Sequence, residues 1–278
     1  MRYRQSMGAV ALLAALAATP ALGQVVDYSK YPAFMGQWDR RGPPNNWIPQ
    51  SGQPPLTPEY EKVWDASKAK VKQGEPGNWP STYCLPEGMP AMMNVYNPFE
   101  IIIKPDTTYI LTSHNNDIYR RIYTDGRDWP ADPERTLEGY SIGRWVDENG
   151  DGKYSVLEVE TRFLKGPRGY DTSGLPFDKD NQTIIKERIH LDKGNPNTLV
   201  LEMTVIDHAL TRPYTKIQKV TRNPNPRPAW HSDVCSEDNT WVKIGDQPYY
   251  LSSDGKLMPS KKDQPPPDLS YFKQAPKK

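Results

Sequence analysis

Residues 154–164 of this chain read Y-S-V-L-E-V-E-T-R-F-L, and this stretch decides the fold class. Apolar and β-branched residues occupy every second position, with charged residues between them: Leu157, Val159, Thr161 and Phe163 against Glu158, Glu160 and Arg162. A period of two is that of a β-strand with one buried and one solvated face. Residues 197–206, N-T-L-V-L-E-M-T-V-I, show the same alternation. The two stretches predict an all-β protein.

Further segments rich in β-branched and aromatic residues predict a series of strands at short spacing. With the two stretches above, the predicted strands are residues 100–104, 107–113, 117–124, 140–146, 154–164, 182–191, 197–206 and 214–221. Strands in series with few helices imply an antiparallel meander, and about eight or more of them are enough to close a barrel. Gly36 and Trp38 form a Gly-x-Trp pattern that resembles the start of lipocalins, so we expect a lipocalin-like (calycin) barrel.

Four ranges organise the chain. Residues 1–23 predict a cleavable signal peptide, because arginines precede an apolar run that ends in small residues. Residues 24–56 are a Pro-rich extended segment, expected to lie on the surface. Residues 57–254 are expected to form one β domain led by a helix over about 58–73, since Thr57-Pro58 is a helix-start signal. Residues 255–278 are basic and Pro-rich, and we expect a disordered tail.

The leader predicts a protein of the periplasm or the secreted fraction. No later segment is apolar enough to span a membrane. The whole chain has 35 basic against 34 acidic residues, and Arg2 and Arg4 would leave with the leader, so the mature chain is close to neutral. This balance argues against a nucleic acid or an anionic membrane surface as partner.

The chain has two cysteines, Cys84 and Cys235. In an oxidising compartment an even pair is most simply one disulfide, and the alternative is two free or metal-bound thiols. We therefore predict a bond that ties an early segment to a late one.

Three strings carry a family resemblance: C-L-P-E-G-M-P at 84–90, R-R-I-Y-T-D-G-R at 120–127 and S-I-G-R-W at 141–145. They resemble a family of exported, functionally uncharacterised bacterial proteins, over about residues 56–235. The resemblance implies export, this fold and the pairing of the two cysteines, and no activity. Relatives commonly carry histidines where this chain has Trp129 and Tyr140, so no histidine chemistry comes with the resemblance.

Residues 139–143, G-Y-S-I-G, match the nucleophile elbow of serine hydrolases. That motif needs a sharp turn from a strand into a helix beside a histidine base, and no helix pattern follows here. We interpret Ser141 as a strand residue, and we assign no catalytic residue. The four histidines show no close ligand spacing for a transition metal.

Residues 147–152, D-E-N-G-D-G, followed by Glu158, satisfy the pattern of an EF-hand calcium loop. The flanks predict strands rather than helices, so we favour a hairpin turn. The alternative is a calcium ion held by Asp147, Asn149, Asp151 and Glu158, and calcium is the one cofactor that we consider.

The densest set of candidate ligand-binding residues combines arginines with aromatic side chains: Tyr119, Arg121, Tyr123, Arg127, Trp129, Tyr140 and Arg144. Stacking and forked hydrogen bonds suit such a set to a small aromatic or carboxylate-bearing molecule. The alternative is a solvated face of cross-strand pairs. Alternation sends Arg120 with Ile118 and Ile122 to the face opposite Arg121.

The leading interpretation is an exported β-barrel that binds a small, partly apolar or aromatic ligand. Two alternatives belong to other classes. One is a periplasmic lyase, isomerase or hydrolase that uses tyrosine, arginine and carboxylate groups at the barrel mouth. The other is a calcium-stabilised structural protein of the envelope.

Overall fold

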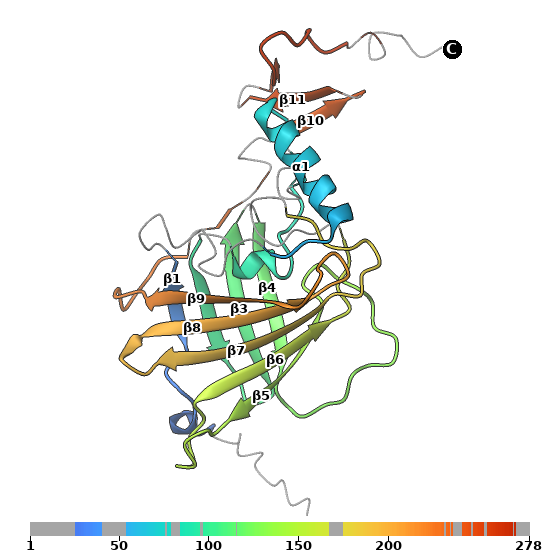
Figure 1. The fold of residues 1–278 in the computed structure, drawn as a ribbon. Helices are drawn as coiled ribbons and strands as arrows, with labels where there is room; N and C mark the ends of the chain where they lie inside the picture. The colour runs from blue at the N-terminus through green and yellow to red at the C-terminus, as the bar shows by residue number, and fades with distance from the viewer. Residues whose placement is uncertain are drawn as a thin grey trace, which may run out of the picture.

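Nine strands close into a barrel in the computed structural model of the chain (Figure 1). The structure describes residues 26–40, 54–75, 77–78, 84–94, 97–114, 116–166, 175–230, 232–233, 235, 241–245, 247–252, 255–268 and 270. The barrel strands are β1 (Gly36–Asp39), β2 (Phe99–Ile103), β3 (Thr107–His114), β4 (Asn116–Tyr123), β5 (Tyr140–Val146), β6 (Val156–Arg162), β7 (Ile184–Asp192), β8 (Asn195–Ile206) and β9 (Tyr214–Arg222). The other elements are a small sheet of β10 (Trp241–Ile244), β11 (Gln247–Leu251) and β12 (Leu257–Pro259), the helix α1 (Pro58–Lys72), and the short helices η1 (Tyr28–Lys30) and η4 (Ala91–Met93). The expected all-β barrel is confirmed.

The eight strands predicted from the sequence are β2 to β9, and one pair of them runs differently from a pure meander. β4 and β5 are parallel and share two residue pairs, Ile122 with Ser141 and Tyr123 with Ile142. The connection between them, residues 124–139, returns along the barrel before β5 begins (Figure 1). A parallel pair needs such a crossover, which a short hairpin turn cannot supply.

The barrel is closed by β1, a strand in the segment that we expected to lie on the surface. Trp38 pairs with Phe99 on β2 and with Arg222 on β9, so β1 joins the two ends of the sheet. Its indole is fully buried and donates a hydrogen bond to the carbonyl oxygen of Phe34 (2.7 Å). The surface expectation is therefore wrong for β1. A strand of four residues is too short to show an alternating pattern.

Buried side chains line the barrel and pack at both of its ends. The wall contributes buried residues such as Ile101, Ile110, Leu157, Ile189 and Leu199. At the end near η1, Phe34 and Tyr31 pack against Trp145, with ring centroids 5.5 and 5.2 Å away. At the other end, Met92 and Met93 on η4 are buried, together with Met89 just ahead of this helix.

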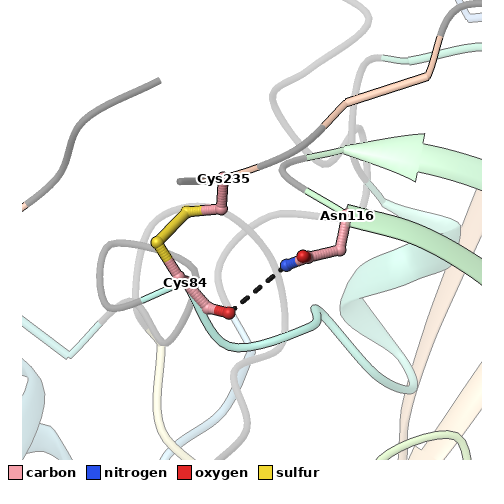
Figure 2. Close-up of a disulfide and its surroundings, with 3 residues drawn as sticks. All are labelled: Cys84, Asn116 and Cys235. Carbon is pink, nitrogen blue, oxygen red and sulfur yellow. Dashed lines mark hydrogen bonds between the residues drawn. A yellow bond between two sulfur atoms is a disulfide. The ribbon is translucent and has the colours of Figure 1, made fainter. Parts of the chain in front are cut away.

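The predicted disulfide is confirmed: Cys84 and Cys235 are bonded, with Cα atoms 5.3 Å apart (Figure 2). The side chain of Asn116, at the start of β4, donates a hydrogen bond to the carbonyl oxygen of Cys84 (3.3 Å). The bond joins the segment ahead of β2 to the segment after β9. It therefore holds these two segments together.

The predicted helix is α1, which begins at Pro58 after the N-cap residue Thr57. The hydroxyl of Thr57 accepts a hydrogen bond from the backbone N–H of Tyr60 (3.4 Å), as the start signal implies. Tyr60 is buried, whereas Val63 and Val71 are exposed, so α1 is only loosely covered. None of the described helices is long and apolar enough to cross a membrane.

Part of the predicted disordered tail is ordered. β12 pairs with β11, and the side chain of Gln264 donates a hydrogen bond to the carbonyl oxygen of Pro248 (2.7 Å). Lys261 forms an ion pair with Glu75 near the end of α1 (2.6 Å). The lysine and proline content predicted a disordered tail, but backbone pairing with β11 orders this part of it. The predicted signal peptide, residues 1–23, lies outside the described residues.

Candidate functional site

A groove of about 490 Å³ lies over β5, β6 and β7. Its charged walls come from outward-pointing side chains of these strands, and Trp129 reaches it from the connection between β4 and β5. The lining residues are Trp129, Ile142, Gly143, Arg144, Glu158, Val159, Glu160, Lys186, Glu187 and Arg188. Two of the predicted ligand-binding residues, Trp129 and Arg144, therefore line one groove.

One row of the groove is a chain of ion pairs across the three strands. Strand register places Arg144 opposite Glu158, and Glu158 opposite Arg188. The Glu158 carboxylate accepts hydrogen bonds from Arg144 Nε (2.8 Å) and Arg188 Nη1 (2.7 Å). Arg188 also binds Glu148 (2.7 Å), and this hydrogen bond lowers the pKa of Glu148. The ion pairs within this row therefore hold its side chains in place.

The neighbouring row is less tightly paired. Register places Ile142 opposite Glu160, and Glu160 opposite Lys186. Glu160 accepts a hydrogen bond from Arg162 Nε at 2.5 Å, whereas the Lys186 ammonium is 3.9 Å from Glu160. Lys186 is thus held more loosely than the arginines of the first row.

A stack of arginine and aromatic side chains adjoins the groove at Trp129. The guanidinium of Arg162 lies 4.5 Å from the centroid of the Trp129 ring, and the Tyr140 ring is 6.1 Å from it. Tyr140 in turn lies 4.9 Å from Tyr123, and Arg127 lies 3.8 Å from the centroid of the Tyr123 ring. Arginine over an aromatic face is a favourable contact that keeps both groups oriented. The predicted residues Tyr123, Arg127, Trp129 and Tyr140 therefore meet in space.

The other two predicted ligand-binding residues lie elsewhere. Tyr119 and Arg121 point outward from β4 and do not line the groove. The Arg121 guanidinium lies 5.5 Å from the ring of Tyr119 and 6.0 Å from that of Tyr109 on β3. They form a separate exposed patch on the barrel wall.

The buried arginine of β4 is Arg120, on the face opposite Arg121 as strand alternation predicts. Its guanidinium forms two hydrogen bonds to the Glu187 carboxylate, at 3.0 and 2.5 Å. It also donates to Ser141 (3.0 Å) and Thr161 (2.7 Å). Ile118 and Ile122, which share its face of β4, are buried like Arg120.

A small cavity lies beside two buried charged side chains that face the barrel interior. The described residues leave a cavity of about 10 Å³ beside Glu187 and Lys216, room for about one water molecule. The Lys216 ammonium is buried there and donates a hydrogen bond to Asn94 (3.0 Å). A ligand of the usual size, several hundred Å³, does not fit beside these side chains.

Ser141 has the surroundings of a structural residue. It is fully buried in the middle of the barrel and shares a hydrogen bond with Thr161 (2.8 Å) as well as with Arg120. β5 continues to Val146 without turning into a helix. The geometry is not that of a nucleophile elbow.

In the glycine-rich loop after β5, backbone N–H groups of the loop donate hydrogen bonds to an aspartate side chain. The Asp147 carboxylate accepts hydrogen bonds from the N–H groups of Gly150 (2.8 Å), Asp151 (3.3 Å) and Gly152 (2.8 Å). Partial desolvation raises its pKa, but these N–H groups outweigh that and leave the pKa below its usual value. Glu158 is engaged by arginines on the groove side. The calcium site of Asp147, Asn149, Asp151 and Glu158 stays a prediction.

Within the described part of the chain, no group of three or more His, Cys, Asp or Glu side chains is placed to hold a metal ion. Three histidines each contact a different carboxylate: His114 and Glu87 (3.4 Å), His190 and Glu202 (3.1 Å), and His208 and Asp180 (2.5 Å). His231 lies outside the described residues.

One carboxylate of the arginine and aromatic stack is held as an anion. Hydrogen bonds from the Arg127 side chain lower the pKa of Asp125 to about 2. Asp125 is therefore ionised at neutral pH and has no proton to donate as a general acid.

The fold and the site define a closed nine-stranded β-barrel with a charged and aromatic groove on its outer wall. Comparison with models of protein families, with curated proteins and with solved structures finds no match for the chain.

Proposed function

We propose that this protein is an exported β-barrel that binds a small, partly aromatic ligand in the groove over β5, β6 and β7. The observation that carries the proposal is the groove itself, whose volume of about 490 Å³ lies within the range of small-molecule sites. Trp129 and Ile142 supply an apolar wall, and the charged rows supply polar contacts. The cavity beside Glu187 and Lys216, at about 10 Å³, is far smaller than this groove.

Export is supported by two features. The leader pattern of residues 1–23 is that of a secretory signal. The bond between Cys84 and Cys235 is of a kind that persists in oxidising compartments. We expect N-terminal sequencing of protein isolated from its own cells to begin at Gln24.

Binding is favoured over catalysis by the state of the charged groups. Glu158 and Glu160 are each held by at least one arginine, and Asp125 is ionised. A general acid or base needs a pKa near the working pH, and the pKa of Asp125, about 2, lies far below it. Fixed ion pairs instead suit a surface that orients a ligand without reacting with it.

Native mass spectrometry of protein purified from its own cells tests the proposal. We expect a retained small molecule on the wild-type protein, lost in Trp129→Ala and kept in the control Tyr119→Ala. Tyr119 is an exposed aromatic residue of the same barrel wall outside the groove. A retained molecule that survives Trp129→Ala and leaves with Tyr119→Ala would move the site to the β3–β4 face.

A further inference from the structure

We infer that the groove selects a planar anion, with a carboxylate at Lys186 and an aromatic ring against Trp129 and Ile142. This inference rests on the proposed function, because it names the class of ligand for the same site. It depends on the balance of charge in the groove, the pairing of each charged group, and the register of the strands.

The charge balance of the groove is positive. Among the described residues that line it or pair with its lining, the cations are Arg144, Arg162, Lys186 and Arg188, and the carboxylates are Glu148, Glu158 and Glu160. Glu187 also lines the groove, but its carboxylate is neutralised by Arg120 on the barrel side. One cation is therefore in excess.

The pairing distances identify Lys186 as the cation that a ligand can engage. Each arginine has a carboxylate oxygen within 2.8 Å, from Glu158, Glu148 or Glu160. The Lys186 ammonium is 3.9 Å from Glu160, whose other oxygen already binds Arg162 at 2.5 Å. With 58% of its side chain exposed, Lys186 can turn towards a ligand anion without breaking a short contact.

Strand register fixes the distance between the two halves of the site. Ile142, Glu160 and Lys186 lie side by side on three adjacent strands. Because neighbouring strands are about 4.8 Å apart, the backbones at Ile142 and Lys186 are roughly 10 Å apart. An aromatic ring with a short acidic side chain spans that distance. A cationic ligand would meet the excess positive charge of the groove instead, at a cost in affinity.

Isothermal titration calorimetry at low salt with three probes of similar shape tests the inference. The probes are indole-3-acetate, neutral indole and cationic tryptamine. We expect indole-3-acetate to bind about tenfold more tightly than indole, and tryptamine to bind most weakly. Lys186→Met should lower the affinity for indole-3-acetate to that for indole, and leave the affinity for indole unchanged. Added salt should weaken only the binding of the anion.

Lys219→Met is the matched control, because Lys219 is an outward lysine of β9 with 61% of its side chain exposed. It should bind indole-3-acetate as the wild-type protein does. Indole or tryptamine binding as tightly as indole-3-acetate, or full affinity in Lys186→Met, would overturn the anion preference. In that case weaker binding in Trp129→Ala would still leave the groove as the site. If no probe binds, the anion site is refuted. If Trp129→Ala binds every probe as the wild-type protein does, both the anion site and the groove as the ligand site are refuted.

Discussion

Arg120 and Arg121 are adjacent in β4 and have opposite environments. Arg120 points into the barrel and is saturated by Glu187, Ser141 and Thr161, whereas Arg121 is exposed on the outer wall. The alternation that separates them is legible in the sequence, because it depends only on strand geometry. The sequence does not show which of the two arginines has a carboxylate partner, because Glu187 belongs to β7, three strands along the sheet from β4.

Removing Arg120 should be far more costly than removing a surface arginine. In Arg120→Met the Glu187 carboxylate stays buried without its cation, which costs about 3–5 kcal/mol of unfolding free energy. Arg144→Met, which removes the exposed partner of Glu158, should cost less than about 1 kcal/mol. Urea unfolding of the oxidised proteins measures both. Equal costs in the two variants would contradict the buried network.

His208 offers a pH test at the same scale. A hydrogen bond to Asp180 raises the pKa of His208 above its usual value. Because the folded pKa is the higher one, this pair stabilises the fold below about pH 6.5 and the contribution is lost as pH rises through the folded pKa. NMR titration of the imidazole protons should show a raised pKa that falls in Asp180→Asn. An unchanged value in that variant would remove Asp180 as the cause.

At the scale of elements, β5 explains two glycines that the sequence offered as part of a catalytic motif. Gly139 has φ +70°, in the left-handed region, and a Cβ there would lie 2.7 Å from the carbonyl oxygen of Arg162. A Cβ on Gly143 would lie 2.6 Å from Ile122 and 3.2 Å from the carbonyl oxygen of Glu158. The glycines therefore permit close packing of β5 against its neighbours. A local motif match could not distinguish this from a nucleophile elbow.

Gly143→Ala should destabilise the barrel by about 1–3 kcal/mol, the usual cost of overpacking a filled interior. Gly194→Ala is the control, since its added Cβ meets one side-chain oxygen of Asp192 at 3.3 Å in an exposed turn. Thermal unfolding of the two variants gives the comparison. A Gly143→Ala protein as stable as the wild type would show that the packing around β5 has room to spare.

The same scale shows why the groove could not be predicted in full. Alternation places Glu158, Glu160 and Arg162 on the outer face of β6, and this is correct in the structure. Lys186 and Arg188 join them only through the pairing of β6 with β7, whose register depends on a loop between them of more than 20 residues. The arginine and aromatic stack was predictable in part, because Tyr123, Arg127 and Trp129 are close in sequence.

At the scale of the whole molecule, strands with apolar or β-branched enrichment were predictable, and most of the others are short. The eight predicted strands have five or more residues. The strands that were not predicted are β1 and β10 with four residues, β12 with three and β11 with five. Barrel closure through Trp38 is a long-range contact that no local pattern reports. The disulfide was predictable from the cysteine count, because the chain offers one pairing.

The disulfide should contribute strongly to stability. The bond joins residues with a separation of 151 and so lowers the conformational entropy of the unfolded chain. In the chain-entropy model this raises the free energy of unfolding by about 5 kcal/mol. We expect no free thiol in denatured, unreduced protein, and a lower unfolding midpoint in a Cys84→Ser/Cys235→Ser protein. Two titratable thiols per chain would be incompatible with the bond.

We propose that the ligand site lies on the outer wall and not inside the barrel. Two tryptophans, one at each place, can distinguish the two. Trp129 lines the groove, and Trp38 is buried inside the barrel. The most direct measurement is ¹⁹F NMR of protein labelled with 5-fluorotryptophan, assigned with Trp129→Phe and Trp38→Phe, during titration with indole-3-acetate. We predict that the Trp129 resonance shifts while that of Trp38 stays in place. A shift of Trp38 with Trp129 unchanged would contradict it.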